Sequence, residues 1–242
     1  MNISEKLIRA KTDLDEVFDA GKKAEYDRFW DSYQQNGKKK TYQGAFAGHG
    51  WNNENLKPKY NLNNGITNAA FMFYSSAFVG DLAQHLEDLG ITLDTSKATN
   101  MASFANSAQK VTRFGVIDAT GANTANSGNI FSFCMALEKI DKWVVSEATN
   151  IGTLTSCSKL TSLAIEGTIG QTGSFKDSPL DKESITSVVT HLSDTATKKS
   201  MTFKKTAVDT AFETSDGAND GSTSDEWQAL IGTKPNWTVV LV

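Results

Sequence analysis

Two cysteines are the side chains with the most chemical potential in this chain, because a thiolate is both a nucleophile and a metal ligand. Cys134 and Cys157 each follow a large apolar residue, Phe131 and Leu154, by three positions. Small hydroxyl residues occupy the same place elsewhere in the chain, which is typical of a packing position. We therefore expect both thiols to be buried, reduced and inert, with a disulfide or a catalytic cysteine as the alternatives.

The other residues suited to chemistry are scattered. His49, His85 and His191 lie far apart along the chain. The stretch 216–221 resembles the start of an EF-hand loop, but its twelfth position is Trp227, where calcium requires a bidentate Glu. Phosphate-loop, G-x-S-x-G and H-E-x-x-H motifs are absent from the sequence. We expect no enzyme, no metal and no cofactor. A glycoside hydrolase stays open as an alternative, because Asp and Glu are plentiful and only geometry could identify two that form a catalytic pair.

Composition limits the class of partner. The chain has 24 basic and 28 acidic residues, a net charge of -4, which argues against nucleic acid. No apolar run approaches the roughly 18 residues of a membrane helix, and Met1–Lys6 lacks the apolar stretch of a signal peptide. We therefore expect no nucleic-acid partner, no membrane insertion and no export signal.

An internal repeat organises the middle of the chain. In each unit a large apolar residue, the anchor, is followed three positions later by a small or polar one. The pairs are Phe46 with His49, Phe73 with Ser76, Phe104 with Ser107, Phe131 with Cys134, Leu154 with Cys157, and Phe175 with Ser178. An L-x-x-L-x-L pattern follows most anchors, as Val111–Phe114–Val116, Leu160–Leu163–Ile165 and, less completely, Leu137–Ile140 and Ile185–Val188.

One such unit cannot bury its apolar face alone, so neighbouring units must stack and share a core. L-x-x-L-x-L suits a short strand with alternate side chains inside, and F-x-x-C suits the return segment on the opposite wall. We therefore predict an α/β fold: an irregular leucine-rich-repeat solenoid over residues 38–190. An N-terminal helical segment over 1–37 precedes it, and a C-terminal α+β cap over 191–242 follows it.

The flanking segments carry their own patterns. Residues 2–35 are predicted to be helical, with an a/d stripe that suits either a cap or self-association. Toward the C-terminus, a strand is expected at Ser200–Phe203, and helices at Ala207–Phe212 and Asp225–Ile231. The last strand, Trp237–Val242, is apolar on both faces, so we expect it to be covered or paired.

Three stretches resemble BspA-type leucine-rich repeat proteins over roughly residues 41–190. They are Leu93–Met101, Phe131-x-x-Cys134-x-x-Leu137 and Leu154-x-x-Cys157-x-x-Leu160. The opening stretches 20–30 and 44–51 resemble the variety encoded by gut bacteria and their prophages. The resemblance implies a surface or virion binding module without catalysis.

Outward positions of stacked strands form a continuous surface, so binding is the expected activity. The candidate ligand-binding residues are Arg113, Lys139, Asp141, Trp143, Ser162 and Glu166. An exposed Trp among charges is typical of interface hot spots, and the alternative for each residue is ordinary solvated surface. Mixed charges and small hydroxyls favour a protein or a glycan over a phosphate polymer.

Three functions follow from these expectations. The first is a phage or prophage virion or host-recognition protein that binds a bacterial surface, located in the virion or outside the cell after lysis. The second is a cell-surface adhesin, which the missing signal peptide disfavours. The third is a cytoplasmic interaction scaffold, which fits the same absence. In the first case the N-terminal helix would serve attachment or self-association and raise avidity.

Overall fold

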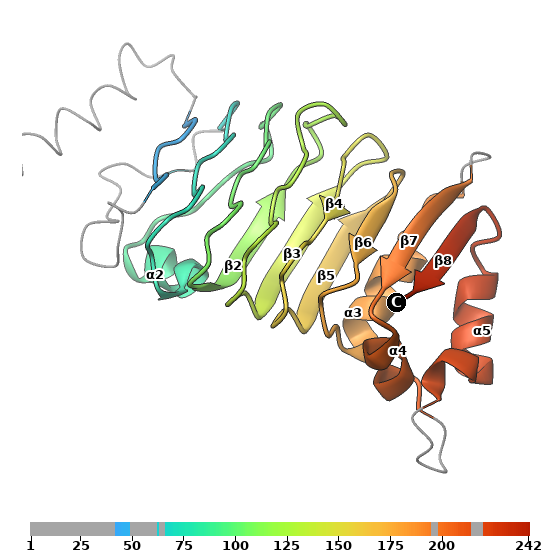
Figure 1. Cartoon of the computed structure of the whole chain (residues 1–242). Coiled ribbons are helices and arrows are strands. Elements are labelled where there is room, and N and C mark those ends of the chain that lie inside the picture. Colours follow the sequence, from blue (N-terminus) through green and yellow to red (C-terminus); the bar gives the residue numbers. More distant parts are fainter. Residues whose placement is uncertain (1–41, 49–61, 63–65, 195–197, 214–219) are drawn as a thin grey trace, which may run out of the picture.

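The computed structural model describes residues 42–48, 62, 66–194, 198–213 and 220–242 (Figure 1). Within these ranges the fold is mixed α/β, with two parallel four-stranded sheets and four α-helices. The helix expected over 2–35, His49 and most of the loop at 216–221 lie outside the described residues.

The first sheet has the strand order β1-β2-β3-β5. Its strands are β1 (Gly80–Asp81), β2 (Val111–Asp118), β3 (Lys139–Val145) and β5 (Ser162–Gly167), and every neighbouring pair is parallel. Strands successive along the chain are therefore neighbours in space, except that β4 belongs to the other sheet. Helix α2 (Leu82–Asp88) follows β1 directly and buries Leu82 and Leu86.

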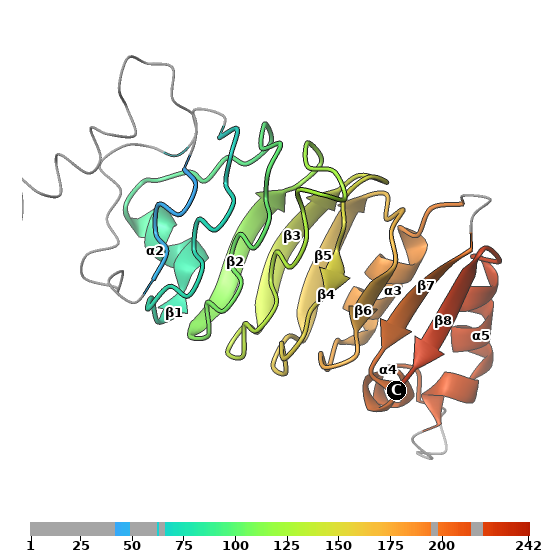
Figure 2. The same cartoon turned by 45° about the horizontal axis from the view of Figure 1, so that its top comes forward.

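The second sheet forms part of the opposite wall, as the two views show (Figures 1 and 2). Its order is β4-β6-β7-β8, again parallel, with strands β4 (Gly152–Thr153), β6 (Gly173–Phe175), β7 (Lys199–Phe203) and β8 (Trp237–Leu241). The pairing of β8 with β7 confirms the prediction that the last strand needs a partner. Helices α4 (Lys205–Ala211) and α5 (Asp225–Gly232) confirm the two expected C-terminal helices, and a short 3₁₀ helix, η2 (Gly221–Thr223), lies between them in the sequence.

Before β6, this wall is built from consecutive tight turns, apart from the two-residue strand β4. We call segments 42–48, 66–76, 98–108, 126–136 and 149–158 the turn ribbon. Alternate N–H groups donate to the next segment, as from Phe73 to the carbonyl of Phe104 at 2.7 Å. The intervening N–H groups donate three residues back, as from Ser76 to Phe73 at 3.1 Å. The backbone N–H groups are thereby hydrogen-bonded, alternately to the next segment and within their own segment, without a regular strand.

Each ribbon segment has two residues with left-handed backbone, four positions apart. The pairs are Gly44 and Gly48, Phe71 and Ser75, Ser103 and Ser107, Asn129 and Phe133, and Gly152 and Ser156. These left-handed residues let the chain turn repeatedly. Each turn closes with a hydrogen bond that spans three residues, as from Ser76 to Phe73, and this is the spacing between an anchor and its small residue.

The predicted anchor row is confirmed. Phe73, Phe104, Phe131, Leu154 and Phe175 are all buried. Ring centroids are 5.1 Å apart for Phe46 and Phe73, 5.3 Å for Phe73 and Phe104, and 6.3 Å for Phe104 and Phe131. Phe203, which the sequence motif does not include, extends the row by stacking on Phe175 at 6.1 Å.

The small residues beside the anchors link one segment to another. The Cys134 thiol donates to the carbonyl of Ala105 at 3.1 Å, and the Cys157 thiol donates to that of Phe131 at 2.9 Å. The Ser178 hydroxyl donates in the same way to Cys157, at 3.2 Å. Both cysteines are buried and free, as predicted.

Two sequence-based expectations about core positions and one about an element type are wrong. Ser107 is half-exposed at a left-handed position, and the neighbouring Ala108 is buried instead. Val116 is 53% exposed, because two residues rather than one separate the buried Phe114 and Ile117.

The third is the strand pattern at residues 185–188, which belongs to helix α3 (Lys182–Thr190). Asp181 caps this helix by accepting from the N–H of Ser184. Hydroxyls of Ser184 and Ser187 accept from the N–H groups of Leu163 and Ile165, at 2.8 and 2.9 Å. The helix therefore covers the free edge of β5, where a further strand would otherwise pair.

The cysteine environment predicts slow thiol chemistry. Burial raises the pKa of Cys134, so its reactive thiolate is scarce at neutral pH. The hydrogen bond with Cys134 lowers the pKa of Cys157, so the protection of Cys157 rests on its burial. We expect alkylation of either cysteine to be roughly 100-fold slower in the native protein than in the denatured chain, since reaction requires local opening. Iodoacetamide labelling followed by peptide mass spectrometry checks each site. Native labelling as fast as denatured labelling would contradict the assignment of inert core thiols.

Candidate functional site

Five of the six predicted ligand-binding residues lie on one side of the first sheet. Arg113, Lys139 and Ser162 are directly paired across β2, β3 and β5, so they form one row. Asp141 lies two residues beyond Lys139, and Glu166 lies near the end of β5. We call the side defined by these five residues the outward face. They are half-buried or exposed, which leaves them accessible to a partner.

Trp143 is the exception, and its predicted exposure is wrong. Its side chain is fully buried and packs edge to face on Phe131, with ring centroids 5.1 Å apart. Strand β3 contains one more residue than β5 between two aligned positions, since Ile140 pairs with Leu163 but Trp143 pairs with Ile165. This bulge reverses the alternation and turns Trp143 inward. Trp143 is therefore a core residue and is removed from the candidate site.

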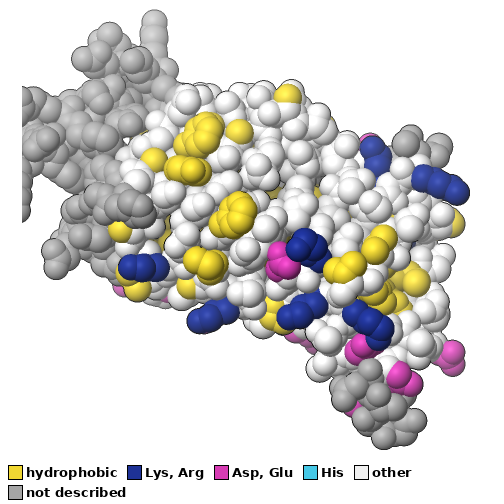
Figure 3. Space-filling model, viewed as in Figure 1, with side chains coloured by type: hydrophobic (Ala, Val, Ile, Leu, Met, Phe, Trp, Pro, Cys, Tyr) yellow, Lys and Arg dark blue, Asp and Glu magenta, His cyan; other side chains and the backbone are white. Residues whose placement is uncertain are grey.

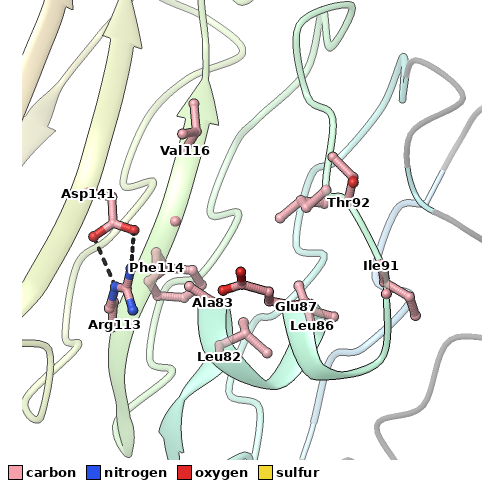
Figure 4. A pocket seen from close by; sticks show the side chains of 13 residues that line it. Leu82, Ala83, Leu86, Glu87, Ile91, Thr92, Arg113, Phe114, Val116 and Asp141 are labelled. Atoms are coloured by element: carbon pink, nitrogen blue, oxygen red, sulfur yellow. Dashed lines mark hydrogen bonds and ion pairs between the residues drawn. The ribbon is translucent and has the colours of Figure 1, made fainter.

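Arg113 is held in a fixed orientation by two acidic residues. Its Nε and Nη2 donate to both carboxylate oxygens of Asp141, at 2.9 and 2.6 Å (Figure 4). Its Nη1 donates to Asp81 at 3.1 Å. Lys139 adds a second cation, with Nζ 3.2 Å from Asp141. Two-point pairing of this kind fixes geometry as well as charge. The Arg113 guanidinium, through its hydrogen bonds, lowers the pKa of Asp141 below its ordinary value.

Asp81 is a site residue that the sequence patterns did not reveal. The same carboxylate that contacts Arg113 also caps α2, because it accepts from the N–H of Gln84 at 2.8 Å. The available signal was an Asp directly before the apolar pair Leu82 and Leu86, which is typical of a helix start. Asp81 therefore connects the start of α2 to the charged row on the sheet.

A pocket of about 500 Å³ lies between α2 and β2, next to this cluster (Figure 4). Apolar lining comes from Leu82, Ala83, Leu86, Ile91, Phe114 and Val116. Its charged lining residues are Glu87, Arg113 and Asp141. The volume falls in the range of small-ligand sites. The apolar lining suits the ring or side chain of a ligand. Because the lining has two acidic residues and one basic residue, it suits a ligand group that carries a positive charge or several hydroxyls.

A second, more polar pocket of about 500 Å³ lies beyond the C-terminal end of α3. It brings Glu147 and Lys234 together with His191 and Ser193, although these three regions are far apart in sequence. Ser193 donates to Glu147, and the His191 Nδ1 lies 2.7 Å from the carbonyl oxygen of Ser187. Lys234 donates to the carbonyl of Leu192 at 2.6 Å. These four side chains are thus already hydrogen-bonded within the protein, two of them to backbone carbonyls. In the part of the chain that the structure describes, no three His, Cys, Asp or Glu residues are grouped to hold a metal ion.

The Asp141 contacts predict a pH-dependent contribution to stability. A carboxyl whose pKa is lowered by folding stabilises the native state above its unfolded pKa of about 3.9, and this stabilisation is lost as pH falls through the folded value. We expect Asp141→Asn to lower the free energy of unfolding by about 1–2 kcal/mol at pH 7. The difference should shrink steadily below pH 4. Urea unfolding across this range measures it.

Glu166→Gln is the matched control. Glu166 pairs with Lys142 at 2.6 Å, but the two side chains are 56% and 44% exposed. The same chemical change there should alter stability by less than about 1 kcal/mol, because water screens exposed pairs. A loss for Asp141→Asn that is equally large at pH 7 and pH 2 would contradict the ionic origin of the effect.

No helix among the described ranges is both long and apolar enough to cross a membrane. No family model, curated protein or solved structure matches the chain. The outward face and its adjoining pocket are therefore the features of the molecule that point to a function.

Proposed function

We propose that the chain is a non-enzymatic binding module of the leucine-rich-repeat solenoid type. In this proposal it recognises a protein or glycan at a bacterial surface and is carried by a phage or prophage. The repeat region, 38–190, carries the binding surface, between an N-terminal helical segment (1–37) and a C-terminal cap (191–242). The observation that supports this best is the placement of Arg113, Lys139 and Ser162 in one row on adjacent parallel strands.

The outward face has the features of a protein or glycan contact surface. Its strands are held by their neighbours, so outward side chains are presented on a rigid frame. Arg113 is already oriented by Asp141 and Asp81, which reduces the ordering cost of binding. Val116, 53% exposed at the pocket, adds apolar contact area beside the charges. Apolar groups near oriented charges are the arrangement expected of an interface centre.

Binding to intact cells with two matched variants tests which surface is used. Val116→Asp adds a charge at the α2 pocket, and Val240→Asp makes the same change on β8 of the second sheet, where the side chain is 37% exposed. We expect fluorescently labelled full-length protein to bind candidate host cells saturably. Binding should weaken about tenfold or more with Val116→Asp and should not change with Val240→Asp.

Three results would overturn this proposal. Equal effects of the two variants would remove the outward face from binding. Absence of saturable binding to any candidate host would favour the cytoplasmic scaffold, and attachment to the producing cell alone would favour the adhesin.

Self-association through residues 1–37 is a separate part of the proposal. The a/d stripe includes Leu7 and Leu14, and two or more copies per particle would convert weak contacts into avid binding. Sedimentation of the full chain is expected to show an oligomer that the double substitution Leu7→Glu, Leu14→Glu converts to a monomer. A monomeric wild-type chain would contradict this part.

A further inference from the structure

We propose that the turn ribbon is a second binding surface, which takes an uncharged glycan by stacking sugar rings on exposed aromatic side chains. This surface lies on the wall opposite the outward face and does not depend on the function proposed above. Three independent observations support it: the ribbon carries no charge, it exposes aromatic rings, and it holds two of those rings at costly backbone positions.

The first observation is the absence of charge. Charged residues make up 21% of the chain, yet none occurs in segments 42–48, 66–76, 98–108, 126–136 or 149–158. The nearest charges on this wall, Lys176 and Asp177, directly follow β6 and line a shallow pocket together with Met135 and Ser156 at the end of the ribbon. In the space-filling view, hydrophobic side chains dot a largely uncharged wall, and charged side chains lie along its lower edge and toward the C-terminal end (Figure 3).

The second observation is the exposure of large apolar side chains. Phe71 and Tyr74 are each 40% exposed, and Phe133 and Met135 are each 45% exposed. Phe71 and Tyr74 meet edge to face, with centroids 5.8 Å apart and an interplanar angle of 76°, so they form an aromatic corner. Phe133 lies two ribbon segments further on, about 10 Å along the stack at the usual strand spacing. It occupies the second left-handed position of its segment, the one that Ser75 takes beside Tyr74, so it is also offset across the ribbon from Phe71. Rings at this separation can contact different residues of one oligosaccharide.

The third observation is backbone strain. Phe71 and Phe133 have φ of 57° and 60°, a region that a bulky residue rarely adopts. Other ribbon segments place Gly, Ser or Asn at the equivalent positions, so the fold itself does not need an aromatic ring there. Strain that folding does not require is typical of functional surfaces.

The chemistry between the rings favours a sugar over other partners. The polar side chains around the aromatic positions are amides and hydroxyls, among them Asn100, Ser103 and Asn106, all half-exposed. A sugar ring has an apolar C–H face, which stacks on an aromatic ring, and a rim of hydroxyls, which amides and hydroxyls can pair. An anionic membrane would require Lys or Arg, which the ribbon lacks. Protein interfaces are enriched in Arg, which the ribbon also lacks.

Affinity electrophoresis of the full-length protein tests this proposal. The gels contain a neutral α-glucan, a neutral β-glucan, a mannan or, for comparison, an anionic polyuronate. We expect retardation in at least one neutral gel and none in the polyuronate gel. Phe71→Ser and Phe133→Ser each install a residue that the ribbon already uses at an equivalent position, so the fold should be retained. Each should weaken binding roughly five- to tenfold, and Phe133→Tyr should restore it.

The controls separate this surface from the outward face. Val116→Asp should leave glycan retardation unchanged, whatever its effect on cell binding. No retardation in any neutral gel, retardation by the polyuronate alone, or equal retardation of the wild type and both Ser variants would each overturn the proposal. Cell binding that depends on Phe71 and is abolished by protease treatment of the cells, but not by periodate, would identify a protein partner instead.

Discussion

Replacing Phe131 with Ala is expected to lower the free energy of unfolding by about 3–5 kcal/mol. The ring is 1% exposed and lies between the two walls. Its centroid is 5.3 Å from that of Phe114 on the first sheet and 6.3 Å from that of Phe104 in the turn ribbon. Truncation removes contacts to both walls and leaves a cavity that the neighbouring strands cannot close. Such a loss threatens a domain of ordinary stability.

Phe133→Ala is the control for this prediction. Phe133 is two residues further along the same segment, but 45% of its side chain is exposed. The same chemical truncation should therefore cost less than about 1 kcal/mol. Urea unfolding followed by circular dichroism compares the two variants. Similar losses would contradict the placement of Phe131 in a shared core.

Gly167→Ala is expected to lower the free energy of unfolding by about 2–4 kcal/mol. Gly167 ends β5 with φ of +92°, and a Cβ atom there would lie 2.0 Å from the carbonyl oxygen of Val145 on β3. Relief requires β3 and β5 to separate, because the clash is with backbone rather than with a flexible side chain. The change therefore tests the close approach of two neighbouring strands.

Gly232→Ala is the matched control at the end of α5. A Cβ at this position meets nothing within 4 Å. Alanine also favours helix over glycine, so we expect no loss and a gain of up to about 1 kcal/mol. Thermal unfolding of both variants measures the contrast. A Gly167→Ala protein as stable as wild type would show that the two strands are not packed as described.

The anchor row was predictable because its signal is local and repeated. Phe73, Phe104 and Phe131 recur with a small residue three positions later, and only a shared buried row satisfies all of them. The pairing of Arg113 with Asp141 was implicit in the same repeat, since 28 residues separate them and one repeat carries the chain to the adjacent strand. Repetition therefore predicts which residues become neighbours, even across long sequence separations.

The departures arise where the register changes by one residue. Strict alternation places Trp143 on the outside of the sheet and Val116 on the inside. The bulge between Ile140 and Trp143 turns Trp143 inward, and an equivalent extra residue in β2 turns Val116 outward. A bulge depends on how neighbouring strands pair, which no single segment reveals. The α2 pocket was unpredictable for a related reason, because α2 interrupts the repeat instead of following it.

Helix α3 shows a different kind of departure. Its residues Ile185 and Val188 fit a strand pattern as well as a helix pattern. The deciding contacts are the hydroxyls of Ser184 and Ser187, which take the place of a partner strand along β5. The local signal that favoured the helix was Asp181, a typical N-cap residue directly before it in the sequence.

An equilibrium binding isotherm on intact cells tests the central claim, a non-enzymatic module for a bacterial surface, most directly. Fluorescent full-length protein is titrated onto candidate host cells, removed by washing, and titrated again onto the same cells. We predict saturable binding with the same capacity and affinity in both rounds, because a binding module leaves its ligand unchanged. Absence of saturable binding, or a second-round capacity that falls in proportion to the time of first contact, would contradict this claim.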